Sequence, residues 1–145
     1  MTSILTQTVT RLLLAPILVV ATAVLVKGYA DVGDGFAAGV IAALGILLQY
    51  LALGRAEARR RLPIRLVPHA AFAGLLGALA VAFSPLLRGD AVLTHLPPPG
   101  EHVVELGTVE LTTAVLFDVA VFLLVLGAVV GIIDAIAGAA EESDR

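Results

Sequence analysis

The sequence predicts an all-α polytopic membrane protein with four transmembrane helices. Hydrophobic residues make up 59% of the chain, only 14% of the residues are charged, and the mean hydropathy is +1.03. Four apolar runs approach or exceed the length needed to cross a hydrocarbon core of about 30 Å at a rise of about 1.5 Å per residue. The runs lack the period-two alternation of barrel strands, so each is expected to be an α-helix whose backbone groups are paired internally.

The apolar runs place the spans within a single membrane domain, residues 1–145. The expected spans are residues 4–26, 36–53, 66–87 and 111–136. The first span also has the apolar centre of a secretory signal, but three further spans follow it, so we expect it to be retained.

Basic residues predict the orientation of the chain. Five of the nine Lys and Arg residues lie between the second and third spans: Arg55, Arg59, Arg60, Arg61 and Arg65. Loops rich in Lys and Arg stay in the cytoplasm, so we expect the loop at 54–65 and both termini to be cytoplasmic. The turn at 31–35 and the loop at 88–106 are then expected to face outward. The basic residues themselves are interpreted as topology signals and head-group contacts.

Composition also narrows the chemistry. The chain has no cysteine, which excludes disulfides, thiolate zinc sites, iron–sulfur ligation and covalent haem attachment. It contains no phosphate loop, dinucleotide fingerprint or catalytic triad, and no basic footprint for nucleic acid. We therefore expect no enzyme activity, no cofactor and no nucleic-acid partner.

Asp118 is the one carboxylate deep within a predicted span. It lies about four residues, or roughly 6 Å, from the centre of the last span. An ionised carboxylate at this depth costs about 2.5 to 3.5 kcal/mol on insertion scales, so it is expected to be protonated, paired or facing water. Two roles are open for Asp118: a place in an ion or proton path, or a bond to a neighbouring helix or backbone group.

Three further ionisable residues are candidates for an ion or proton path. Glu110 is expected at the outer end of the last helix, and Asp134 at its cytoplasmic end. Relative to Asp118, the helical azimuth changes by about 80° to Glu110 and about 160° to Asp134, which argues against one chain of carboxylates along the helix. Both are interpreted as interfacial residues. His69, in the first turn of the third span, is a candidate proton relay at neutral pH.

A glycine-punctuated motif leads into the second span. Its candidate site residues are Gly28, Gly33, Asp34, Gly35, Phe36 and Gly39. Small residues also recur at helical spacing later in the chain, at Gly74, Ala78, Gly127, Gly131 and Gly138. Small residues allow helix backbones to approach closely, so we expect each helix to have close neighbours.

The outer loop carries a set of residues able in principle to bind a metal: His95, Glu101, His102 and Glu105. Their spacing matches no metal signature. Three consecutive prolines at 97–99 favour an extended polyproline segment. The loop is therefore interpreted as a solvated connector without a metal.

Two segments carry a resemblance to a known family. The run at 28–54 is similar to a glycine-rich segment leading into a helix, and the run at 116–127, with Phe117 followed by Asp118, is similar to the family's final helix. The order of four spans with a basic middle loop agrees. Over almost its whole length the chain resembles the MnhB/MrpB-like subunits of the multisubunit Mrp/Mnh monovalent cation/proton antiporters.

The sequence departs from the family pattern in the first outer turn. The family run typically has His-Asn after its first glycine, then a proline and three consecutive glycines. Here those places hold Tyr29, Ala30, Val32 and the run Gly33-Asp34-Gly35. Similar subunits occur in membrane-bound hydrogenases that couple redox chemistry to ion pumping. Such a hydrogenase component, and a free-standing structural four-helix protein, are the alternatives.

The resemblance implies an accessory subunit in the plasma membrane of a prokaryote. Its partners would be the other subunits of the antiporter complex and membrane lipid, and the exchanged ions would be Na⁺ or K⁺ and H⁺. The larger subunits of such complexes hold the lysine and glutamate relays. Asp118 would then line or support an ion path at a boundary between subunits.

Overall fold

The fold is described from a computed structural model, covering residues 3–28, 33–94, 104–106, 109–111 and 113–143. Within these residues, four helical segments are long and apolar enough to cross a membrane, which confirms the predicted all-α membrane fold. The long helices are α1 (Ile4–Lys27), α2 (Asp34–Leu53), α4 (Val67–Phe83) and α5 (Thr113–Ser143). Two 3₁₀ turns, η1 (Ile64–Leu66) and η2 (Ser84–Arg88), extend α4 at its two ends.

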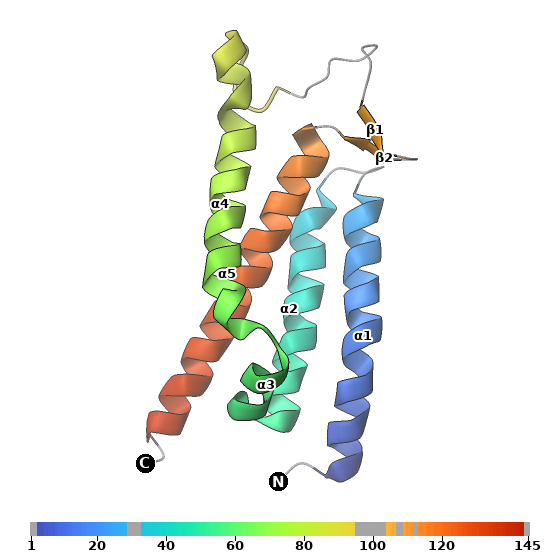
Figure 1. The fold of residues 1–145 in the computed structure, drawn as a ribbon, viewed down its shortest axis with the longest axis vertical. Helices are drawn as coiled ribbons and strands as arrows, with labels where there is room; N and C mark the ends of the chain where they lie inside the picture. Colours follow the sequence, from blue (N-terminus) through green and yellow to red (C-terminus); the bar gives the residue numbers. More distant parts are fainter. Residues whose placement is uncertain (1–2, 29–32, 95–103, 107–108, 112, 144–145) are drawn as a thin grey trace.

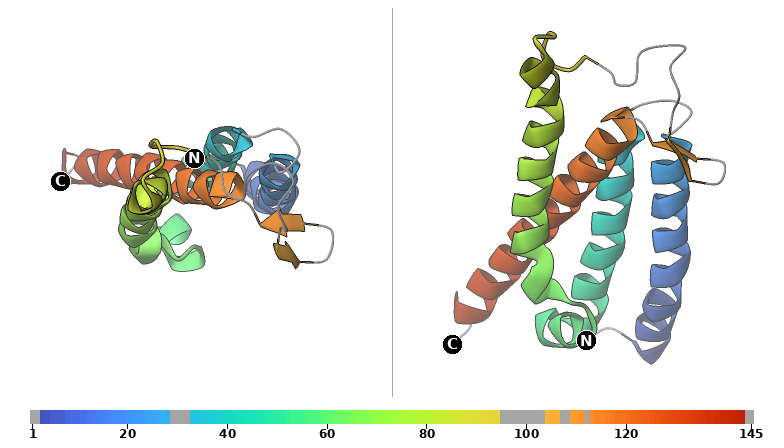
Figure 2. Two further views of the ribbon diagram at one scale, coloured as in Figure 1. Left: turned by 90° about the horizontal axis from the view of Figure 1, so that it is seen from above. Right: turned by 45° about the horizontal axis from the view of Figure 1, so that its top comes forward.

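Helices α2 and α5 form the inner pair of the bundle. Helix α1 packs mainly against α2, and α4 packs against α5, so α1 and α4 lie on opposite outer sides (Figures 1 and 2). Helix α5 runs obliquely past its neighbours (Figure 1). Within the most apolar 18-residue stretch of each helix, 44% of the stretch in α2 is buried, compared with 11% in α1. Large apolar side chains on α1 and α4 consequently face outward, as lipid-facing or subunit-facing surfaces do.

Glycines set the closest approach between α4 and α5. A Cβ atom added at Gly74 would lie 2.4 Å from the backbone N of Leu124, and one added at Gly127 would lie 2.4 Å from the backbone N of Ala71. No side chain fits at either position. The small residues predicted to mediate helix packing do so here, on both helices.

The basic loop contains a short helix, α3 (Arg55–Arg61), where the sequence predicted only a connection. Gly54 separates α3 from α2 with a φ of +80°, which a residue with a side chain rarely adopts. Helix α3 lies at the same end of the bundle as the start of α1 and the end of α5 (Figure 1). This shared end agrees with the predicted topology, and the compartment that it faces remains a prediction.

Two boundaries differ from the prediction. Residues Val104–Leu106 (β1) and Val109–Leu111 (β2) form an antiparallel pair in which Glu105 is opposite Glu110. The sequence repeats Val-Glu-Leu on either side of Gly107-Thr108, and this alternation around a glycine is a hairpin signal. The last helix begins at Thr113 and continues to Ser143, beyond the expected 136, because the Ala- and Glu-rich end of the apolar run favours helix.

Candidate functional site

The carboxylate of Asp118 lies at the N-terminal end of α2. Its Oδ2 accepts a hydrogen bond from the backbone N–H of Gly33 at 3.0 Å. Gly33 is the N-cap residue of α2, with a φ of +120° and no capping side chain. The first N–H groups of a helix lack intrahelical partners, and the helix dipole favours negative charge there. A carboxylate from α5 therefore occupies the position at which α2 has no capping group of its own.

Glycines make room for this contact. A Cβ at Gly28 would lie 3.1 Å from the Asp118 Oδ2 atom, and a Cβ at Gly35 would lie 2.2 Å from the Asp118 backbone oxygen. One turn further along α2, a Cβ at Gly39 would lie 2.9 Å from the Cβ of Val125. The structure thus brings together two features that are separate in the sequence: the glycine motif and Asp118. Asp118 is only 5% exposed as a result.

The rest of the glycine motif lies around this contact without joining it. Asp34 Oδ2 is 3.5 Å from the Lys27 ammonium group, so an ion pair links the end of α1 to the start of α2. Phe36 points outward and is 61% exposed. Asp34 therefore pairs the start of α2 with the end of α1, while Phe36 belongs to the outer apolar surface.

A second polar centre, the Asp134 cluster, lies at the other end of the bundle. Tyr50 donates its hydroxyl hydrogen to Asp134 Oδ1 at 2.9 Å. Arg55 donates from Nε to Oδ1 at 3.1 Å and from Nη2 to Oδ2 at 3.3 Å, which is a bidentate pairing. Arg59 Nε lies 3.4 Å from Oδ1. Glu141 accepts a further hydrogen bond from Arg55 at 3.2 Å.

The Asp134 cluster joins α2, α3 and α5. A Cβ at Gly138 would lie 2.8 Å from Arg55 Nη2, so the absence of a side chain there lets Arg55 lie against α5. The hydrogen bond from Arg55 to Asp134 raises the pKa of Arg55, and the hydrogen bond to Glu141 raises it to a smaller extent. Arg55 therefore stays charged. Nearby, Tyr50 and Val130 belong to the buried core that includes residues of α3 and η1. The arrangement anchors the basic loop to the last helix.

Sequence reasoning missed the Asp134 cluster. It treated Asp134 as an interfacial residue and a candidate for an ion path, and Arg55 and Arg59 as topology signals and head-group contacts. A signal was present: Asp134 and Glu141 are seven residues apart in one helix, so they share a face that a basic neighbour can pair with. The turn at Gly54 sets the direction of α3, and it therefore decides which arginine of α3 reaches the face of α5 that carries Asp134 and Glu141.

The remaining candidates for an ion path are not partners in the hydrogen bond between Asp118 and Gly33. Glu110 is in β2, so the prediction that it starts the last helix was wrong; the helix begins three residues later, after the hairpin. Asp134 follows Asp118 by sixteen residues in α5, which is about 24 Å along a helix. His69 is exposed in the first turn of α4. Their proposed roles in ion or proton transfer stay predictions.

The outer-loop residues are only partly described. His95, Glu101 and His102 lie outside the described residues, and Glu105 is in β1. Within the described part of the chain, no three His, Asp or Glu side chains are grouped so that they could hold a metal ion.

Comparison with known proteins places these features in a family. A family model described as "Domain related to MnhB subunit of Na+/H+ antiporter" matches residues 5–131. The chain is 34% identical over 134 residues to the B-type subunit of the Na⁺/H⁺ antiporter of Alkalihalophilus pseudofirmus, covering 92% of both chains. It is also 34% identical over 130 residues to the B-type subunit of the Na⁺/H⁺ antiporter of Bacillus subtilis, covering 90% of both.

A further relative is much longer than this chain. A probable K⁺/H⁺ antiporter protein of Rhizobium meliloti, named as a combined A/B-type subunit, is 36% identical over 117 residues, which cover 77% of this chain and 11% of that protein. The family match includes the glycine motif and Asp118, whereas Asp134 and Glu141 follow its last matched residue.

Proposed function

Since the chain belongs to the family of domains related to the MnhB subunit of Na⁺/H⁺ antiporters, we propose that it is an accessory membrane component of a multisubunit antiporter exchanging monovalent cations for protons. The observation that carries this proposal is the match to B-type antiporter subunits over about nine-tenths of both chains. The protein is then a multi-pass component of a prokaryotic plasma membrane, and a transporter subunit without catalytic activity of its own.

The cation is proposed to be Na⁺. Two relatives that match over about nine-tenths of their own length are named for Na⁺/H⁺ exchange, while a relative matched over 11% of its length is named for K⁺/H⁺ exchange. The two buried or half-buried carboxylates of α5 each accept a hydrogen bond from a protein group, Asp118 from Gly33 and Asp134 from Arg55. The ion path itself is therefore assigned to partner subunits.

The contribution of this chain is proposed to be structural support of that path. Asp118 holds the start of α2 through Gly33, and the Asp134 cluster holds the basic loop against α5. Both contacts fix how the inner helices α2 and α5 lie relative to each other. A protein with exposed apolar faces on its outer helices and a fixed inner pair is suited to contact neighbouring subunits.

Partner identification tests the proposal. The chain, tagged at its C-terminus, is purified from its own membranes in mild detergent, and the proteins retained are identified by mass spectrometry. Recovery with large antiporter-like subunits and without redox proteins is expected. Recovery with hydrogenase subunits would assign the chain to a redox-driven ion pump, and recovery of the chain alone would contradict a role within a complex.

Exchange activity tests the same proposal independently. Membrane vesicles lacking this chain are expected to lose Na⁺-dependent proton movement, and re-expression of the chain is expected to restore it. Vesicles that exchange Na⁺ for H⁺ normally without the chain would show that it is not required.

A further inference from the structure

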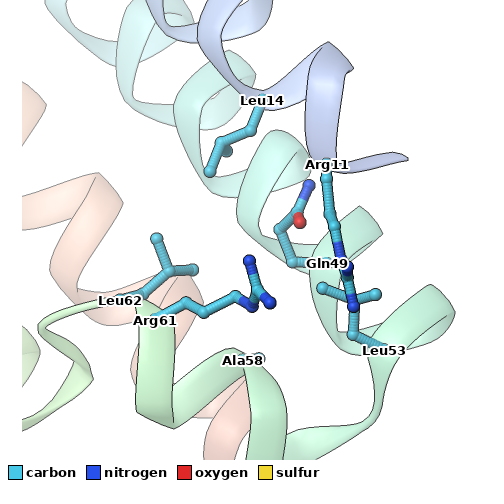
Figure 3. A pocket seen from close by; sticks show the side chains of 7 residues that line it. All are labelled: Arg11, Leu14, Gln49, Leu53, Ala58, Arg61 and Leu62. Atoms are coloured by element: carbon cyan, nitrogen blue, oxygen red, sulfur yellow. The ribbon is translucent and has the colours of Figure 1, made fainter. Parts of the chain in front are cut away.

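A cavity opens between α1, α2 and α3 at the end of the bundle that carries the basic loop. Its volume is about 320 Å³, which is within the range of roughly 300 to 1,000 Å³ typical of ligand pockets. Figure 3 shows the residues that line it: Arg11, Leu14, Gln49, Leu53, Ala58, Arg61 and Leu62. A ligand would bind in this cavity whether or not the protein takes part in antiport.

The polar side of the cavity has an excess of positive charge. Arg11 comes from α1 and Arg61 from α3, and both side chains extend toward the space between these helices (Figure 3). Arg61 donates from Nε to Glu57, which leaves its terminal amino groups without a protein partner among the described residues. Arg11 is in none of the ion pairs found among the described residues. Two guanidinium groups thus line the cavity, and only the one on Arg61 is paired with a carboxylate.

The excess of positive charge affects the pKa of Glu57. The hydrogen bond from Arg61 lowers the pKa of Glu57, and the charges of Arg61, Arg60 and Arg11 lower it further. Glu57 therefore stays ionised and still leaves the site with a net positive charge. An anionic ligand would balance this positive charge.

The opposite side of the cavity is apolar. Leu14, Leu53 and Leu62 line it, on α1, α2 and at the end of α3. Gln49, the polar residue between them, is already engaged, because its Nε2 donates to the backbone oxygen of Thr10 at 2.7 Å. A ligand that fits this cavity carries negative charge at one end and hydrocarbon at the other.

The position of the cavity indicates the source of such a ligand. Helix α3 connects two membrane helices at the basic end of the bundle, so the cavity lies where acyl chains meet head groups. Guanidinium groups pair with phosphate oxygens through two parallel hydrogen bonds, and basic pockets between transmembrane helices suit acidic lipid head groups. A free phosphate ion would use the arginines but would leave the leucine wall without a partner.

We propose that this cavity binds an anionic phospholipid, with Arg11 and Arg61 on the phosphodiester group and Leu14 and Leu53 against the first carbons of the acyl chains. The lipid would bridge α1 to α3. Direct contacts between these two helices do not feature in the main packing of the bundle, in which α1 lies mainly against α2 and α3 against α2 and α5.

Lipid retention in detergent tests the proposal. The full chain is purified with phosphatidylglycerol present, and the bound phospholipid is measured by mass spectrometry as a function of added lipid. The variants are Arg11→Gln and Arg61→Gln, with Arg60→Gln as the matched control because Arg60 is exposed on the same helix but does not line the cavity. Each cavity variant is expected to weaken retention about fivefold, and Arg60→Gln much less.

A second variant separates binding from folding. Leu14→Trp keeps every charge but fills the apolar side, so it is expected to weaken phosphatidylglycerol retention while the chain elutes normally on gel filtration. Equal losses in Arg60→Gln and the cavity variants would reduce the effect to general surface charge and overturn the proposal. Equally tight retention of phosphatidylcholine, or displacement of phosphatidylglycerol by millimolar inorganic phosphate, would also overturn it.

Discussion

Asp118 accepts a hydrogen bond at 3.0 Å from the backbone N–H of Gly33, a residue 85 positions earlier in the chain. The contact joins the last helix to the start of the second. It is a bond to a backbone group, one of the two roles considered for Asp118, made where a helix dipole favours negative charge, while a place in an ion path stays a prediction. The carboxylate therefore has an architectural task whether or not ions pass nearby.

Asp118→Asn is expected to slow Na⁺/H⁺ exchange more than Glu110→Gln does. The asparagine keeps an acceptor oxygen for Gly33 but loses the charge at the start of α2, at a cost of about 0.3 to 1 kcal/mol in folding free energy. Glu110 is in β2, outside this contact. The measurement is proton movement in vesicles that contain normal amounts of every subunit. Unchanged exchange in the Asp118→Asn vesicles would remove its charge from the mechanism.

Gly35→Ala is expected to destabilise the chain by about 1 to 3 kcal/mol, because the added Cβ would lie 2.2 Å from the Asp118 backbone oxygen and force α2 away from α5. The control is Gly131→Ala, whose Cβ would meet only Val67 at 4.0 Å. There alanine gains about 0.5 to 1 kcal/mol of helix propensity. Thermal unfolding in detergent measures both. Equal stability of the two variants would contradict the close approach at Gly35.

Tyr50 and Asp134 are expected to be energetically coupled. Removal of the hydroxyl in Tyr50→Phe breaks the 2.9 Å hydrogen bond to the carboxylate, and Asp134→Asn removes its charge. Hydrogen bonds to charged groups contribute about 1.5 to 3 kcal/mol, so a double-mutant cycle should give a coupling of that order at most. Unfolding of the two single variants and the double variant supplies the numbers. Additive effects would show that the contact is not formed in the membrane protein.

The Glu57–Arg61 pair predicts a pH dependence. The hydrogen bond from Arg61 lowers the pKa of Glu57 below its ordinary value of 4.5. Because the folded-state pKa is depressed, the stabilisation is fully present above about pH 4.5 and is lost as the pH falls through the folded pKa. The Tm difference between the parent chain and Glu57→Gln should therefore be constant near neutrality and shrink in acid.

The control for this pH dependence is Glu142→Gln. Glu142 is exposed near the end of α5. Its Tm difference from the parent chain is expected to change little over the same acid range. A Glu57→Gln difference that stays constant down to about pH 3 would contradict the ion pair.

Much of the fold follows from local properties of the sequence. The four membrane helices could be predicted because hydropathy and run length depend only on neighbouring residues. The pairing of β1 with β2 was predictable from the repeated Val-Glu-Leu, although the expectation of a plain connector overlooked it. The end of α5 was predicted too early, at residue 136. A helix does not have to stop where an apolar run stops, because Ala and Glu also favour helix, and α5 continues to Ser143.

The sequence by itself determined the helices, the basic loop between the second and third spans and the positions of small residues. Only the tertiary structure decided which groups meet: Asp118 with Gly33 across 85 residues, and Asp134 with Arg55 across 79. Hydropathy places a helix in a membrane but carries no information about which of its faces meets which neighbour. That choice depends on backbone approach at glycines such as Gly35 and on the turn at Gly54, which are properties of the packed bundle.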